Sequence, residues 1–131
     1  MHKGSCLCGD VRFTISGPLR SVIACHCSQC RKMSGHFWAS TSAPAKDIEV
    51  EGYTYVRWFK ASDHACRGFC VNCGSSIFWK KLAQPAGSEE WSVAAGAFET
   101  EVPALHHHIY VGDKPSYYEI GDGTPQFEGS D

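Results

Sequence analysis

The sequence lacks any apolar run near the roughly 20 residues that a membrane-spanning helix needs. Its amino terminus, from Met1 to Cys6, also lacks the apolar stretch of a secretory signal and leads directly into cysteines. These absences argue against a membrane protein and against secretion. We therefore expect a soluble protein in the cytoplasm.

Excess positive charge is missing as well. Twelve lysines and arginines stand against 14 aspartates and glutamates, which gives a net charge of −2, and no basic tail or stripe interrupts this balance. Proteins that bind nucleic acid normally carry such a basic surface, because they must neutralise phosphates. The composition thus predicts no nucleic-acid partner.

Helical periodicity is the third absence. No stretch repeats its apolar residues every 3.6 positions over three turns, whereas short stretches such as Val11 to Ser16 alternate apolar and polar residues, as strands do. The 131 residues, 43% of them hydrophobic, are enough for one hydrophobic core but not for two. We predict one mainly β domain over residues 1–131.

The expected elements are short strands separated by glycine and proline. Strands are predicted near residues 11–16, 22–24, 37–41, 48–51, 53–59, 64–69, 77–79 and 91–95. The two strands around Gly52 read as a hairpin, and Ser28 to Ser34 can form one helical turn that Gly35 ends.

Cysteine is what the chain has in abundance, with eight residues. They occur at C-x-C, C-x-C-x-x-C and C-x-x-C spacings, which are typical of metal ligands. A reducing compartment would keep these residues as thiols rather than disulfides. The spacing therefore favours metal binding.

The central motif is Cys25-x-Cys27-x-x-Cys30, at the end of a predicted strand. Residues two apart on an extended segment share a face, and the next two residues let a turn bring the third sulfur alongside. Zinc takes four ligands, but this run supplies three with no obvious fourth. Structural zinc sites are closed by four protein ligands, whereas catalytic sites keep one position open. The motif predicts a catalytic zinc.

The remaining pairs each supply half a site. Cys6-x-Cys8 and Cys70-x-x-Cys73, each followed by glycine, together make a four-thiolate zinc centre that would join the amino terminus to the middle of the chain. We expect a structural zinc there, and hence two zinc ions per chain. The alternative is that these four are ordinary buried cysteines.

Several histidines could close the second centre. His26 lies between two ligands on a strand and should point to the opposite face, so it is a poor ligand. The other candidates are His36, His64 and the tract His106 to His108, although a lone histidine is more often on the surface or in a satisfied core position. The tract reads as an exposed strand end without a function.

Cys66 is the odd thiol. With Cys70 and Cys73 it forms C-x3-C-x2-C, a spacing found in radical enzymes with an iron–sulfur cluster. Those enzymes need a much larger αβ barrel, and they usually carry an aromatic residue where this chain has Asn72. We interpret Cys66 as a buried or partly exposed thiol outside both centres.

In four ordered motifs the sequence resembles the glutathione-dependent formaldehyde-activating family, also called centromere-protein-V-like, whose fold is Mss4-like. The motifs are Gly4 to Gly9, Cys25 to Lys32 with Ser34 and Gly35, Arg67 to Gly74, and His108 to Tyr110 followed by Pro125 to Phe127. The chain departs from the family at Tyr117-Tyr118, where a tryptophan is frequent. It also departs near Gly96, where many members have an aspartate.

The resemblance implies several small antiparallel sheets joined by zinc, with a structural zinc on Cys6, Cys8, Cys70 and Cys73 and a reaction centre on Cys25, Cys27 and Cys30. It also implies addition of a small thiol, glutathione in the named activity, to formaldehyde. Carbon–sulfur lyase names the same reaction in reverse. The competing readings are an enzyme of the same fold acting on another thiol or electrophile, and a non-catalytic zinc module that binds a protein partner.

Glutathione is charged, so its recognition would require cationic or backbone donors near the second zinc. The candidates are Arg31, Lys32 and Arg67. For each of them the alternative is an ordinary solvated surface residue.

Overall fold

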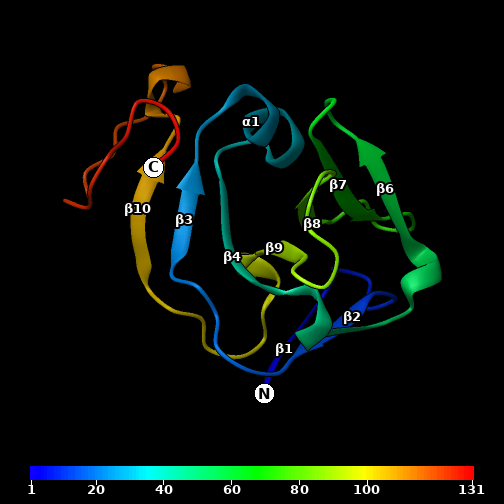
Figure 1. Cartoon of the computed structure of the whole chain (residues 1–131). Coiled ribbons are helices and arrows are strands. Elements are labelled where there is room, and N and C mark those ends of the chain that lie inside the picture. Colours follow the sequence, from blue (N-terminus) through cyan, green and yellow to red (C-terminus); the bar gives the residue numbers. More distant parts are fainter.

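The computed structural model describes residues 1–131 as two β-sheets and one short α-helix (Figure 1). The strands are β1 (His2–Ser5), β2 (Arg12–Ile15), β3 (Val22–Cys25), β4 (Trp38–Pro44), β5 (Ile48–Glu51), β6 (Val56–Lys60), β7 (Ala65–Cys70), β8 (Ser76–Lys81), β9 (Glu90–Ala94) and β10 (Leu105–Ile109). The helix α1 spans Ser28–Ser34, and single 3-10 turns span Ala45–Asp47, Tyr53–Tyr55, Ala95–Ala97 and Val111–Asp113. The fold is thus mainly β, as expected, and no helix is long and apolar enough to cross a membrane.

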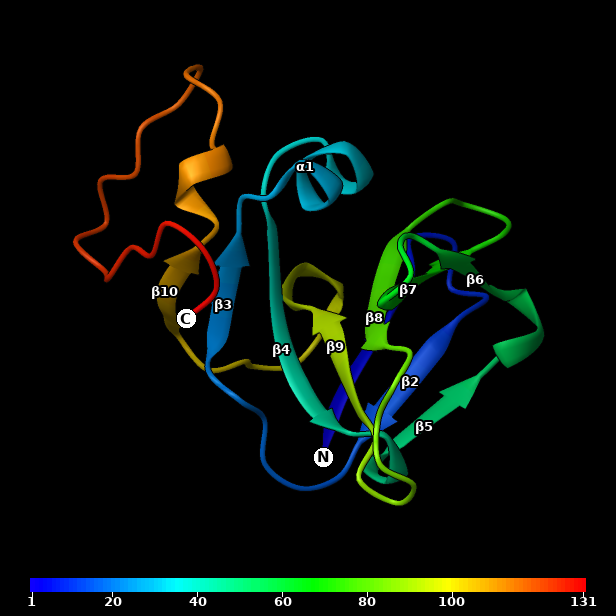
Figure 2. The ribbon, with the colours of Figure 1, turned by 45° about the horizontal axis from the view of Figure 1, so that its top comes forward.

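The smaller sheet has the antiparallel order β1-β2-β5, and it packs against the larger one through a shared core. Phe13 of β2 supplies the central contact. Its ring lies 5.9 Å from that of Phe78 on β8 and 5.1 Å from that of Phe98, both edge-on. Figure 2 shows β2 and β5 paired next to β8. Full burial of a phenylalanine contributes about 1.5–3 kcal/mol, so this contact joins the two sheets firmly.

The larger sheet has seven strands in the order β10-β3-β4-β9-β8-β7-β6. All neighbours are antiparallel except β10 and β3, which run parallel, so this sheet is mixed rather than purely antiparallel. Helix α1 connects β3 to β4 at one end of the sheet, between the β3–β4 pair and the β6–β7 pair (Figures 1 and 2). It begins after Cys27 and ends at Gly35, which has the left-handed φ of 87° that glycine adopts without strain.

The predicted hairpin around Gly52 is wrong. β5 pairs with β2 in the small sheet, whereas β6 pairs with β7 in the large one. Gly52 has φ 75°, and a β-carbon at this position would collide with the backbone carbonyl of Asp10. This glycine and the following 3-10 turn redirect the chain from one sheet to the other.

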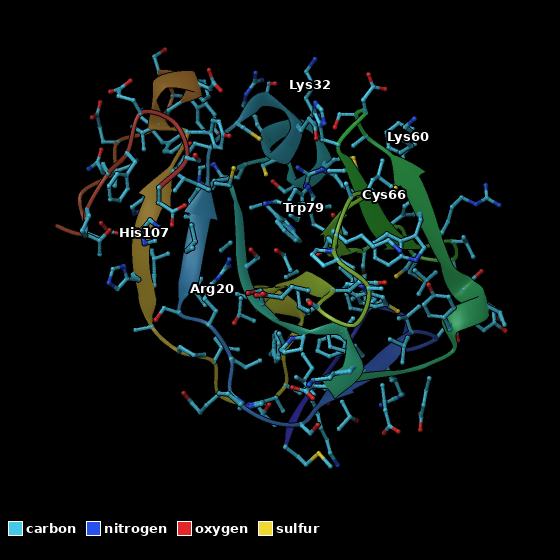
Figure 3. The ribbon with its side chains drawn as sticks, viewed as in Figure 1. Arg20, Lys32, Lys60, Cys66, Trp79 and His107 are labelled. Atoms are coloured by element: carbon cyan, nitrogen blue, oxygen red, sulfur yellow. The ribbon has the colours of Figure 1, made fainter.

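The expectation that the histidine tract is an exposed strand end is also wrong. His107 and His108 are 8% and 3% exposed, although His106 is exposed. Their strand β10 pairs with β3 on one side, and on the other side His108 exchanges backbone hydrogen bonds with Pro125 and Phe127. His107, labelled on β10 in Figure 3, also contacts the Asp131 carboxylate at 2.8 Å. The carboxy-terminal segment therefore covers this edge of the sheet.

Candidate metal centres

The four-cysteine cluster comprises Cys6, Cys8, Cys70 and Cys73, whose Sγ atoms all lie within 4.8 Å of one another. Cys6 and Cys8 follow β1, and Cys70 ends β7. The Sγ atom of Cys8 is 3.6 Å from that of Cys6 and 3.7 Å from that of Cys70. A tetrahedron with zinc–sulfur bonds of about 2.3 Å has sulfur–sulfur edges of about 3.8 Å. The donor set and its dimensions both fit zinc.

Tight turns position these thiols. Gly9 and Gly74, with φ 83° and 78°, each donate a backbone hydrogen bond to the carbonyl of the cysteine that opens their turn, Cys6 or Cys70. The Val11 N–H donates to the Cys6 Sγ at 3.3 Å. The hydrogen bond from Val11 favours the charged thiolate of Cys6, which is the form that binds metal.

The pKa values within this cluster diverge. A backbone hydrogen bond from Asp10 acts to lower the pKa of Cys8, but burial and the neighbouring thiols raise it to about 12. Burial acts to raise the pKa of Cys73, but hydrogen bonds from Ser75 and the Cys8 backbone lower it to about 5. Hydrogen bonds within the cluster thus favour the thiolate of Cys73 over that of Cys8, and a bound cation would displace the protons of all four thiols.

The three-cysteine cluster comprises Cys25, Cys27 and Cys30, whose Sγ atoms also lie within 4.8 Å of one another. Cys25 ends β3, Cys27 is the residue that caps α1, and Cys30 lies in the helix. The Cys27 Sγ accepts a hydrogen bond from the Cys30 N–H at 3.4 Å. No further cysteine and no histidine, aspartate or glutamate joins this group. The cluster offers three soft ligands and lacks the fourth that closes a structural zinc site.

Hydrogen bonds between the three thiols dominate their titration. Those from Cys25 and Cys30 stabilise the Cys27 thiolate and lower its pKa to about 2. The hydrogen bonds to Cys27 and Cys30, together with burial, raise the pKa of Cys25. The direction of the Cys27 shift favours its thiolate, which is the form that binds a metal.

Arg67 is the cation next to this cluster. It lies on β7, is 2% exposed and donates a hydrogen bond from Nη2 to the Cys30 Sγ at 3.2 Å. Its guanidinium carbon is 5.7 Å from the centroid of the Trp38 ring. The surface alternative is therefore wrong for Arg67. Lys32 is exposed and extends away from α1 (Figure 3), and Arg31 is half-buried.

The histidines lie outside both clusters. His26 is buried and uses its two ring nitrogens elsewhere: Nε2 is 2.9 Å from His108 Nδ1, and Nδ1 contacts the Tyr118 hydroxyl. His108 continues this network to the Asp122 carboxylate at 2.8 Å, and this hydrogen bond lowers the pKa of Asp122 to about 2. The expectation that His26 is a poor ligand agrees with this arrangement. His36 contacts the Tyr117 hydroxyl and is not part of either cysteine cluster.

This histidine network makes stability depend on pH. Burial lowers the pKa of His26 from 6.5 to about 4, and the nearby His108 and His36 add to the effect. Between these values the unfolded chain binds a proton that the folded chain does not, so stability falls as pH falls through this range. We expect His26→Gln to lose less unfolding free energy than the parent between pH 7 and pH 5.

Urea unfolding at the two pH values, on samples matched for metal content, measures this difference. His26→Gln serves as the control for metal loss, because acid release of metal affects the parent and the variant equally. Equal losses in parent and variant would show that His26 titrates normally.

Cys66, labelled in Figure 3, is buried on β7. It belongs to neither cluster. Its side chain alternates with that of Arg67, so it points away from the three-cysteine cluster. We expect Cys66→Ala to keep the metal content and to lose only on the order of 1 kcal/mol of stability. Elemental analysis and thermal unfolding check this expectation, and loss of one metal equivalent would contradict the grouping of the cysteines.

An open cleft of about 590 Å³ lies between α1 and the four-cysteine cluster. Its walls include Met33 and Ser34 of α1, Trp38 of β4, and Cys6 and Ser75. Clefts of this size commonly take small ligands. The cleft does not reach the thiols of the three-cysteine cluster, but it shares Trp38 with Arg67.

The chain is similar to one protein family, to two curated proteins and to a solved structure. The family model described as glutathione-dependent formaldehyde-activating enzyme matches residues 1–113. A Halomonas elongata protein that is provisionally named as an enzyme of this kind is 28% identical to the chain. The match covers 90% of this chain and 80% of that protein. An uncharacterized lyase of Schizosaccharomyces pombe is 25% identical, over 96% and 90% of the two chains. A crystal structure of a Rhodobacter sphaeroides protein matches with a TM-score of 0.57 and 25% identity, over 79% of this chain and 99% of that one.

Proposed function

The chain belongs to the glutathione-dependent formaldehyde-activating family, and from that premise we propose that it is a zinc-dependent enzyme of the carbon–sulfur lyase type. It would add a small thiol such as glutathione to formaldehyde or a related aldehyde, and catalyse the reverse reaction. The observation that supports this proposal is the three-cysteine cluster, which gathers three thiols without a fourth protein ligand. A purely structural site would be closed by four.

The residues divide into two zinc sites in this proposal. Cys6, Cys8, Cys70 and Cys73 would hold a structural ion, and Cys25, Cys27 and Cys30 would hold the ion of the reaction centre. When bound at the three cysteines, zinc would supply a Lewis-acidic position at which a substrate sulfur is held as its thiolate. The chain itself contributes three thiolates and leaves the fourth position to the substrate.

The reaction balances without any change of oxidation state. A carbon–sulfur bond forms between the thiolate sulfur and the aldehyde carbon, and the π electrons of the carbonyl group move to its oxygen. The proton released by the thiol ends on that oxygen, which becomes the hydroxyl of the hydroxymethyl thioether. No organic cofactor is needed.

Nuclear magnetic resonance of glutathione and formaldehyde mixtures tests the proposal. Separate resonances of the free and adduct forms allow their exchange to be followed, so a catalyst appears as faster exchange between them. We expect the zinc-loaded protein to accelerate this exchange, and Cys27→Ser, which loses one thiolate, to leave it at the uncatalysed rate. The same rate with and without the parent protein would reject glutathione and formaldehyde as substrates.

A further inference from the structure

Arg67 is a buried charge without a carboxylate partner. Its side chain is 2% exposed, and its only hydrogen bond in the chain is the one from Nη2 to the Cys30 Sγ, at 3.2 Å. The Nε and Nη1 groups are buried and have no hydrogen-bond partner. The ion pairs of the structure involve Lys60, His107 and His108 instead.

A guanidinium cannot give up its proton in a protein, so burial does not make it neutral. A buried unpaired charge is strongly unfavourable, and such a group needs an anion nearby. The sulfur of Cys30 is the one acceptor within hydrogen-bond distance. The buried arginine therefore requires negative charge on the three-cysteine cluster.

The position of the guanidinium is fixed from a second side. Its carbon lies 5.7 Å from the Trp38 ring centroid, and Trp38 pairs in register with Cys25 across β3 and β4. One aromatic residue thus orders both the arginine and the strand end that carries the first thiol. The contact between Arg67 and the cluster is built into the fold.

The contact between Arg67 and Cys30 would balance the charge of a metal-loaded cluster. Three thiolates and one divalent cation carry a net charge of −1, and Arg67 brings the total to zero. The four-cysteine cluster with the same cation carries −2, yet no lysine or arginine donates a hydrogen bond to its sulfur atoms. The arginine therefore lies at the centre that has room for a fourth, anionic ligand.

We propose that Arg67 is the counter-ion of the three-cysteine centre, and that its charge allows this centre to accept a fourth, anionic sulfur from the substrate. The proposal rests on the function proposed above, because it concerns the same open position. With Arg67, arrival of a thiolate takes the total charge from zero to −1; without it, the total would go from −1 to −2 in a buried setting. Arg67 acts through Cys30 and the local charge, so it is a positioning residue.

The experiment compares Arg67→Met, which removes the charge, with Arg67→Lys, which keeps it. Arg57→Met is the matched control, because Arg57 is exposed on the neighbouring strand β6. Competition with a coloured chelator measures the affinity of the second metal, and the sulfur-to-metal band of the cobalt form measures the affinity for added 2-mercaptoethanol. Neither readout depends on turnover.

We expect Arg67→Met to bind the second metal 10–100-fold more weakly, as loss of a hydrogen bond to a metal ligand typically does. Its loaded form should bind the thiol at least tenfold more weakly, whereas Arg67→Lys should recover most of the thiol affinity and Arg57→Met should match the parent. Parent-like metal and thiol affinities in Arg67→Met would overturn the proposal.

A measurement on the parent protein covers the case in which Arg67→Met fails to fold. The Arg67 Nε–H resonance can be assigned by its loss in Arg67→Lys. It should shift when cadmium, used here in place of cobalt, is loaded at the three-cysteine centre, and shift again when thiol is added. A resonance unchanged by the thiol would overturn the proposal. The two proposals can fail separately. If Arg67→Met binds metal and thiol more weakly but the parent does not catalyse adduct exchange, the proposed function is rejected and the role of Arg67 as counter-ion stands.

Discussion

Replacing Cys70 or Cys73 with serine is expected to unfold the protein. Cys70 is fully buried in the hydrophobic core next to Ile77 and Phe78, and its thiol lies 3.7 Å from that of Cys8 near the amino terminus. Structural zinc contributes on the order of 10 kcal/mol to folding in small zinc domains, which is comparable with the whole stability of about 5–15 kcal/mol of a typical domain. Loss of one ligand should therefore remove the folded state.

Circular dichroism, soluble yield and zinc content measure this effect. Cys66→Ser is the matched control, because Cys66 lies on the same strand and is also buried but belongs to neither cluster. The control should fold and carry both metals. A Cys70→Ser or Cys73→Ser protein as stable as this control would remove the structural assignment of the four-cysteine cluster.

Replacing Cys27 with alanine is expected to abolish the second metal site while the fold persists. The variant should lose about one metal equivalent, and its rate of adduct exchange should fall by more than about 100-fold. Replacing a group that only hydrogen-bonds to a metal ligand already lowers metal affinity or activity about 10–100-fold, and Cys27 is itself a ligand in this proposal. The fold should survive because the four-cysteine cluster and the main core lie elsewhere.

Cys27 also caps α1, so alanine removes two interactions at once. Loss of such a cap costs about 0.5–2 kcal/mol. Cys27→Ser separates the two effects, because serine is a good helix cap but a poor zinc ligand. Activity retained by either variant, measured by the exchange assay with metal content in parallel, would exclude the three-cysteine cluster as the reaction centre.

Local patterns were sufficient to predict much of the fold. Alternation along β2 and β5, and the glycine after α1, mark elements that the structure contains. The grouping of seven cysteines into sets of four and three also follows from spacing, because ligand pairs are close in sequence and their turns are short. These features depend on neighbours along the chain.

Long-range contacts were not predictable in the same way. Arg67 lies on a strand that is buried along most of its length, so alternation does not reveal that its side chain meets Cys30, 37 residues away. His26 meets His108 and Tyr118 across separations of 82 and 92 residues. Asp122, which completes this network, carries no local signal beyond a turn-forming neighbourhood.

The open position of the three-cysteine centre is the central claim, and cobalt spectroscopy tests it most directly. In protein with cobalt at both centres, mild chelation should first remove about one metal ion and leave a folded chain, because three protein ligands hold an ion less firmly than four. In a separate sample with both centres loaded, added glutathione should change the ligand-field and sulfur-to-metal bands. Cys27→Ala should show no such change. A spectrum of the parent that shows a protein histidine as fourth ligand and does not respond to any thiol would contradict the account and favour a non-catalytic zinc module.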